Sequence, residues 1–260
     1  MLIRFYEEGD KQKVIRLWQE AFSESEREIL PFLEYINSDM LLMEEKGEII
    51  SMLSLLKVKI GGKSGRYVYA VATGRRFRGM GHASALLAHA KKLTFDAGEE
   101  FLVILPQKES LYAFYEKSGF TPLYCAKRLC GRIGAEALHK VEKITAEEYA
   151  ESKKTYFSGE KYVEWDIKTL DFMKKVYRGE FLKAERDGKT GGIAFCHKAG
   201  DRLVIHELLA DNYETQIIDA FGRFSGAAAF DCIKAEREGD RFGMICPPCN
   251  DFVYFGLGMQ

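Results

Sequence analysis

The sequence predicts an α/β protein made of two tandem copies of one fold, each a mixed, mostly antiparallel twisted sheet packed with helices. Three observations support this prediction. The chain has 260 residues, which is more than one average domain needs. A pair of helical periods followed by turn-separated strands occurs in the first half and again in the second. In the first half, a basic glycine-containing loop joins a strand-like segment to a helix-like one.

The first half begins with an expected strand, two helices and a hairpin. Asp10 is placed to cap the first helix, and Ser25 with Glu28 forms a capping box for the second. Lys46-Gly47 is a turn signal between two apolar runs, which therefore predict a hairpin. In chain order, the expected elements are a strand at 2–6, helices at 10–22 and 25–36, and strands at 40–43 and 49–60.

The most informative segment runs from Tyr67 to Leu87. A short apolar β-type run ends at Gly74, a basic loop follows, and a helical period begins at Ala83. Backbone N–H groups at a helix N-terminus favour an anion, glycines allow close approach, and arginines add charge-assisted hydrogen bonds. The segment therefore predicts a site for a phosphate or pyrophosphate. The loop residues that suit it are Arg75, Arg76, Arg78, Gly79 and Gly81.

Two common phosphate loops do not fit this segment. A P-loop requires Gly-Lys followed by Ser or Thr, and the segment has no such triplet. A dinucleotide-binding fingerprint requires a third glycine, where this chain has Ser84.

The pattern that fits is Arg/Gln-x-x-Gly-x-Gly/Ala over residues 78–83. It resembles the acyl-CoA pyrophosphate loop of the GNAT (GCN5-related) N-acetyltransferase superfamily. A second register, over residues 76–81, also satisfies the formula. The first register is preferred because it places Leu86 and Leu87 where the family's helix has buried leucines.

Segments downstream strengthen this resemblance, which covers residues 1 to about 130. Phe101 to Pro106 is a buried-strand pattern ended by proline, and residues 111–120 are similar to the family's second signature, a short helix followed by Gly-Phe. The resemblance implies transfer of an acetyl group from acetyl-CoA, as cosubstrate and without a metal, to a primary amine of a small molecule or peptide. The alternative function is binding of acyl-CoA or a metabolite without turnover.

The resemblance also implies roles for individual residues. Tyr115 matches the family's tyrosine that donates a proton to the departing thiolate, with Tyr112 as the next candidate. His82 is expected to act through its backbone while its side chain stays solvated. Many relatives have a glutamate base on the motif strand, where this chain has Tyr67 and Tyr69. The expected cofactor-binding residues are Val71, Ala72, Thr73, Arg76, Arg78, Gly79, Met80, Gly81, His82, Ala83, Ser84 and Tyr112.

The second half repeats the helices and strands of the first half but not its basic loop. Residues 210–214 contain two acids and neither glycine nor arginine, and Gly222 to Gly226 is expected to be a turn before another strand. Glu207 is a candidate general base or a solvated strand carboxylate. The expected elements are helices at 145–156 and 167–177 and strands at 181–186, 192–197 and 202–209.

We therefore predict a catalytic domain at 1–138 and, at 139–260, a degenerate copy that shapes the acceptor site and binds no CoA. The formal net charge is −1 at pH 7, so no global field favours nucleic acid or a membrane. No run approaches ~18 apolar residues and the first residues do not resemble a signal peptide, so a cytoplasmic monomer or homodimer is expected. Cys246-Pro-Pro-Cys249 lacks the second ligand pair of a zinc site, and the six cysteines predict free thiols.

Overall fold

The computed structural model describes residues 1–36, 39–135, 138–210, 213–236, 238–249, 251 and 253–258. By their internal contacts, these residues divide into two units. The first comprises Met1–Leu123 and Gly243–Asp251, and the second comprises Tyr124–Phe242 and Phe252–Met259. The first unit thus ends before residue 138, where the sequence placed a boundary, and a segment from near the C-terminus completes it.

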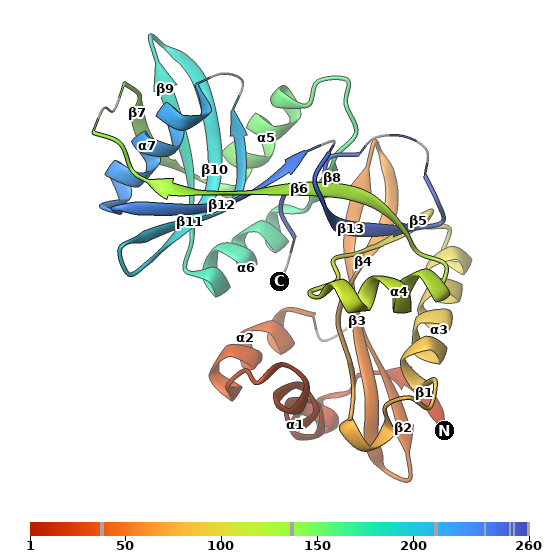
Figure 1. The fold of residues 1–260 in the computed structure, drawn as a ribbon. Coiled ribbons are helices and arrows are strands. Elements are labelled where there is room, and N and C mark those ends of the chain that lie inside the picture. The colour runs from red at the N-terminus through yellow and green to blue at the C-terminus, as the bar shows by residue number, and fades with distance from the viewer. Residues whose placement is uncertain are drawn as a thin grey trace. The chain divides into compact units, whose positions relative to one another are not determined.

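The first unit is a mixed sheet with α1 and α2 on one side of its long strands and α3 on the other (Figure 1). The strand order is β1-β2-β3-β4-β5-β13, in which β4 and β5 are parallel and the other neighbours are antiparallel. Its elements are β1 (Leu2–Phe5), α1 (Lys11–Phe22), α2 (Glu26–Ile36), β2 (Met40–Glu45), β3 (Glu48–Ile60), β4 (Lys63–Thr73), the 3-10 turn η3 (Arg75–Phe77), α3 (His82–Asp96), β5 (Phe101–Ile104), α4 (Glu109–Lys117) and β13 (Asp240–Cys246).

Two local signals of the first unit appear in the structure, the turn between β2 and β3 and the contact between Ser25 and Glu28. Lys46 and Gly47 have φ values of +50° and +81° between β2 and β3, so the predicted hairpin is confirmed. Glycine adopts this left-handed region without strain. At the start of α2, Glu28 Oε2 accepts hydrogen bonds from the Ser25 backbone N–H at 2.8 Å and from its hydroxyl at 2.7 Å.

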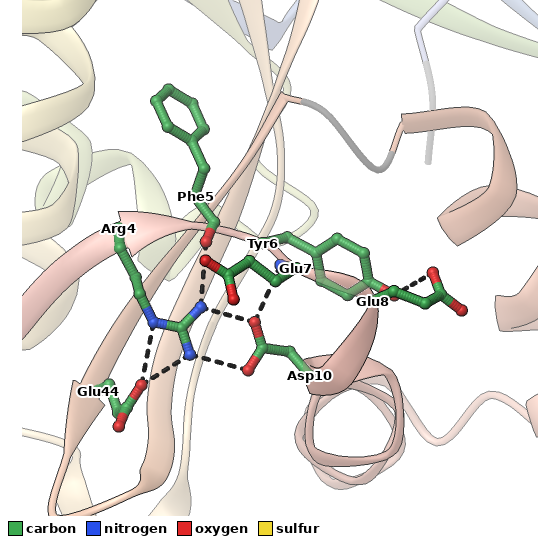
Figure 2. A network of polar contacts seen from close by, with 7 residues as sticks. All are labelled: Arg4, Phe5, Tyr6, Glu7, Glu8, Asp10 and Glu44. Carbon is green, nitrogen blue, oxygen red and sulfur yellow. Dashed lines mark hydrogen bonds and ion pairs between the residues drawn. The ribbon is translucent and has the colours of Figure 1, made fainter.

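Asp10 does not cap α1 with its side chain, and the expected cap was wrong. Its carboxylate instead accepts hydrogen bonds from Arg4 at 2.6 and 2.8 Å and from the backbone N–H of Glu7 at 3.0 Å (Figure 2). Arg4 also donates to Glu44 at 2.6 Å. One guanidinium between two carboxylates therefore ties β1 to β2 and to the start of α1. The hydrogen bond from Arg4 holds the pKa of Asp10 below its usual range.

Strand β4 has two different edges. Along one edge it pairs with β3 up to Thr73, interrupted by a bulge where Ala70 has a φ of +51°. Along the other edge it pairs with β5 only over Gly65–Val68. Pro106 follows β5 closely and has no N–H to extend the ladder. Residues 69–73 of β4 therefore continue beyond the last pair with β5.

The core below this edge lies between the sheet and helices α3 and α4. Leu86 and Leu87 of α3 are fully buried in it. Met244 and Cys246 of β13 belong to the same core, and β13 pairs with β5 over residues 244–246. The segment near the C-terminus therefore supplies both a strand and core side chains to the first unit.

The second unit repeats this architecture. Its strand order is β6-β12-β11-β10-β9-β7, and β11 and β12 are parallel over Arg202–Ile205 and Ala229–Cys232, as β4 and β5 are. The predicted mixed, mostly antiparallel sheet in two copies is thus confirmed. The elements are β6 (Thr121–Arg132), β7 (Lys140–Ile144), α5 (Ala146–Tyr156), β8 (Val163–Trp165), α6 (Ile167–Tyr177), β9 (Glu180–Arg186), β10 (Lys189–Ala199), β11 (Arg202–Ala210), α7 (Glu214–Ser225) and β12 (Ala229–Glu236).

Helix α7 replaces the turn predicted at Gly222 to Gly226, and that prediction was wrong. The helix runs to Ser225, and Gly226 ends it with a φ of +64°. A Cβ on Gly222 would come within 2.2 Å of the Ile133 side chain, so this glycine permits close packing of the helix. Asp211 and Asn212, in the loop before α7, lie outside the described residues.

Candidate functional site

A cleft of about 580 Å³ lies in the first unit at the end of β4. Its walls come from the last residues of α1 and β4, the loop that follows, the start of α3, and α4. Segments that the sequence assigned separately to a strand edge, an anion loop and a helical signature therefore meet around one cavity. The lining residues are Ala21, Phe22, Val71, Ala72, Thr73, Phe77, Arg78, Gly79, Gly81, His82, Ala83, Ser84, Leu111, Phe114 and Tyr115.

The loop between β4 and α3 presents backbone donors to this cleft. Gly79 and Gly81 have φ values of +77° and +83°, and a Cβ on either would meet nothing within 4 Å. Glycine is therefore required by backbone conformation and not by lack of space. Helix α3 begins at His82, so the N–H groups of its first turn have no intrahelical acceptor. Together with the helix dipole, such groups favour an anion.

The end of β4 is held on one side and open on the other. On the β3 side, the Ser51 hydroxyl donates to the Ala72 carbonyl at 2.8 Å and lies 2.9 Å from the Thr73 hydroxyl. Arg78 Nε donates to the Thr73 carbonyl at 3.0 Å, which holds the loop against the strand end. On the β5 side, the ladder stops at Val68. Backbone groups between Val71 and Thr73 are thus placed to pair with an extended ligand.

Tyr115 forms part of the wall that α4 contributes. Its ring packs edge-on against Phe114 and Phe120, with centroids 5.0 and 6.0 Å away, and the residue is 5% exposed. Burial raises the pKa of Tyr115 above the ordinary value for a phenol. Like any phenol, the hydroxyl is protonated at neutral pH, and burial disfavours its ionised form further, so it is available as a hydrogen-bond donor to a group in the cleft.

The structure separates the remaining predicted cofactor residues. Arg76 lines a different hollow, Met80 is 64% exposed, and Tyr112 is 3% exposed within the core, so none of these three lines the cleft. His82 does line it, but its side chain is buried against Phe77, with ring centroids 6.3 Å apart. The expectation of a solvated imidazole was therefore wrong.

Five apolar residues line the cleft without having been predicted from the sequence. Ala21 and Phe22 are the last two residues of α1, on the apolar face of that helix. Only their place at the end of α1 distinguishes them from core residues, and periodicity does not show which end of a helix reaches a cavity. The five are Ala21, Phe22, Phe77, Leu111 and Phe114.

Glu207 is neither a solvated carboxylate nor a base at a cleft. It is fully buried on β11, and its two oxygens each accept a hydrogen bond from Lys153 Nζ at 2.9 Å. The Tyr149 hydroxyl donates to one of the same oxygens. A Cβ on Gly256 would come within 2.4 Å of Glu207 Oε1. The carboxylate is therefore enclosed and its charge is compensated, which is a structural role.

At the start of α7 the second unit differs from the first in charge. Glu214 is the first residue of the helix and forms an ion pair with Lys234 of β12. An acid in the first turn of a helix disfavours an anion at the place where α3 favours one.

Within the described residues, no group of three or more His, Cys, Asp or Glu side chains is placed to hold a metal ion. All six cysteines are free thiols, as the sequence predicted. Among the helices of the described residues, none is long and apolar enough to cross a membrane.

Comparison with known proteins supports the fold. Residues 2–123 match the family described as acetyltransferase (GNAT) domain. No curated protein sequence matches the chain.

Several solved structures share the fold at low sequence identity. A GCN5-related N-acetyltransferase from Anabaena variabilis has a TM-score of 0.72 and 13% identity, covering 94% of this chain and 72% of that one. One from Kribbella flavida has a TM-score of 0.69 and 14% identity, covering 94% and 71%. A tandem GNAT protein from the clavulanic acid biosynthesis pathway has a TM-score of 0.59 and 11% identity. The match covers 96% of this chain and 100% of that one.

Proposed function

We propose that this protein transfers an acetyl group from acetyl-CoA to a primary amine of a small molecule or peptide, because residues 2–123 match the acetyltransferase (GNAT) domain family. The observation that supports this most strongly is the composition of the cleft. One cavity combines an open strand edge, a glycine loop at a helix N-terminus and a buried tyrosine. Its volume of about 580 Å³ lies in the range of small-molecule sites.

Each part of the cleft suits one part of acetyl-CoA. The N–H groups at the start of α3, with Arg78, suit the pyrophosphate. The backbone of Val71 to Thr73 suits the amide groups of the pantetheine arm, which can pair with it as an added strand. The apolar side chains around Tyr115 suit the acetyl group and exclude water from the thioester.

The reaction requires little chemistry from the protein. The free amine attacks the thioester carbonyl carbon, the C–N bond forms, and the C–S bond breaks with its electron pair leaving on sulfur. The nitrogen loses one proton and the sulfur gains one, so charge balances. The Tyr115 hydroxyl, which is protonated at neutral pH, is proposed to donate a hydrogen bond, and then a proton, to the departing thiolate.

The proton from the amine needs an acceptor. The motif strand has Tyr67, which is 1% exposed, where many relatives have a glutamate base. Glu207 is paired with Lys153 and is not accessible as an acceptor. We therefore propose that this proton leaves through water. The second unit, with an acid where α3 has its anion site, is proposed to bind no CoA and to serve acceptor recognition.

Calorimetry with acetyl-CoA, followed by a thiol-release assay against a panel of primary amines, tests the proposed function. The full chain is used because β13 completes the first unit. Saturable binding and amine-dependent release of free CoA are expected. Absence of acetyl-CoA binding would overturn the proposal, and binding without release for any amine would favour the non-catalytic alternative.

A further inference from the structure

A second hollow, of about 350 Å³, lies in the first unit between α1, the start of β3 and the turn η3. It shares Phe77 with the cleft but none of the cleft's anion-loop residues. Six charged residues line it: Lys13, Arg16, Glu20, Glu48, Arg75 and Arg76. We refer to it as the basic hollow.

The two acids of the basic hollow are already engaged. Glu20 accepts a hydrogen bond from the backbone N–H of Arg75. Glu48 pairs with the Arg76 guanidinium at 2.8 Å. Both acids therefore have partners at the rim of the hollow, and they hold η3 in place.

The other cations of the hollow have no such compensation. Within the described residues, Lys13, Arg16 and the guanidinium of Arg75 form no ion pair. Asp10, whose pKa Lys13 helps to lower, is already paired with Arg4 at 2.6 Å (Figure 2). Positive charge is thus in excess around a concave surface, where it attracts anions more strongly than on a flat one.

The second unit contains the equivalent hollow and acts as an internal comparison. This hollow, of about 310 Å³, lies between α5, the start of β10 and the end of β11, which are the counterparts of α1, β3 and β4. Among the described residues, those that line it are uncharged: Ser152, Thr155, Tyr156, Thr190, Gly191, Gly192, Ile193 and Leu209. The fold therefore accounts for the cavity in both units but not for the cations in the first.

We propose that the basic hollow binds a small phosphate-bearing ligand, at a site separate from the cleft. A phosphate can take two parallel hydrogen bonds from an arginine and a further contact from a lysine. The volume suits one small metabolite. Because η3 leads directly into the loop of the cleft, an occupied hollow is placed to influence that loop. The proposal rests on the lining of the hollow alone and does not require acetyltransferase activity.

This proposal is tested by titrating the full chain with pyrophosphate and measuring the NMR chemical shifts of the backbone amides. Saturable shifts are expected at Lys13, Arg16, Arg75 and Arg76. The double variant Lys13→Glu/Arg16→Glu should weaken binding at these amides by at least about tenfold, the effect of losing a hydrogen bond to a charged group. Glu20→Gln keeps an acceptor for Arg75 but removes a negative charge, so it should strengthen binding.

The matched control is Arg27→Glu/Lys117→Glu, which makes the same change of charge at exposed positions on α2 and α4. It should leave the shifts at the hollow unchanged. Shifts that are absent at the hollow, that survive Lys13→Glu/Arg16→Glu, or that are lost equally in the control would overturn the proposal. Shifts at Gly79 and Gly81 report the cleft separately, so failure of the proposed CoA site is distinguishable from failure of this one.

Discussion

Arg78 Nε donates a hydrogen bond to the carbonyl oxygen of Thr73 at 3.0 Å, so the arginine assigned to the pyrophosphate also fixes the loop against the end of β4. Arg76, two residues earlier, forms an ion pair with Glu48 and lines the basic hollow. The two arginines that satisfy the same sequence formula therefore lie at different sites. This difference supports the register that begins at Arg78 and makes Arg76 a natural control.

Arg78→Glu should weaken acetyl-CoA binding by at least ~1.5–3 kcal/mol, because it replaces a charge-assisted hydrogen-bond donor with a like charge. Arg76→Glu makes the same change two residues away and should leave the affinity nearly unchanged. Isothermal titration calorimetry of both variants measures the difference. Equal losses in the two variants would show that general electrostatics, and not the position of Arg78, determines affinity.

Tyr115→Phe should lower turnover by about 10²-fold while leaving the acetyl-CoA dissociation constant nearly unchanged, because it removes only the proton donor to the thiolate. Tyr112→Phe, on the same helix but in the core, should keep turnover close to wild type. Steady-state kinetics and calorimetry together separate the two effects. Normal turnover in the Tyr115 variant, or a large loss in the Tyr112 variant, would contradict the assignment.

Lys153→Met should destabilise the second unit by about 3–5 kcal/mol, because it leaves the buried Glu207 carboxylate without its cation. The double variant Lys153→Met/Glu207→Gln should recover much of this loss. Urea unfolding is followed by the fluorescence of Trp165, which belongs to the second unit, in a Trp18→Phe background that removes the other tryptophan. A loss below ~1 kcal/mol, typical of an exposed pair, would show that the pair is accessible to water.

The Arg4–Asp10 pair should contribute to the pH dependence of stability. The hydrogen bond from Arg4 lowers the native pKa of Asp10, so the unfolded chain binds the proton more readily than the native one. The stabilisation is therefore present above the unfolded pKa of ~3.9 and is lost as pH falls through the native pKa.

Asp10→Asn removes this contribution, so its unfolding free energy should fall less steeply than that of wild type from about pH 5 downward. Urea unfolding at several pH values measures how steeply the unfolding free energy falls with pH. Asp96→Asn, on the exposed face of α3, is the control and should follow wild type. Parallel curves for wild type and Asp10→Asn would mean that the pair has no net effect.

The sequence was sufficient for elements defined by local signals. Lys46-Gly47 marks a hairpin that the structure contains, and the helix predicted at 145–156 corresponds to α5. It was not sufficient for the return of β13 to β5, because nothing near residues 244–246 indicates a partner strand more than a hundred residues away. The glycine signal at Gly222 led to a wrong prediction of a turn, because the small residue is required there by close packing of a helix.

Within the site, the sequence identified segments better than single side chains. Tyr112 and Tyr115 are three residues apart on one helix, so both lie near the same face, and spacing alone does not show which one reaches the cleft. Glu207 was equally ambiguous. An acid in a strand is expected to be solvated unless a buried partner is known, and its partner Lys153 lies on a helix far away in sequence.

The central claim is that the first unit, and not the second, binds acetyl-CoA. The measurement that tests it most directly is the stoichiometry of acetyl-CoA binding to the full chain by calorimetry, repeated with Arg78→Glu. We predict one acetyl-CoA per chain, with that single site weakened in the variant. Saturation at two per chain, or a site of unchanged affinity in Arg78→Glu, would contradict the claim.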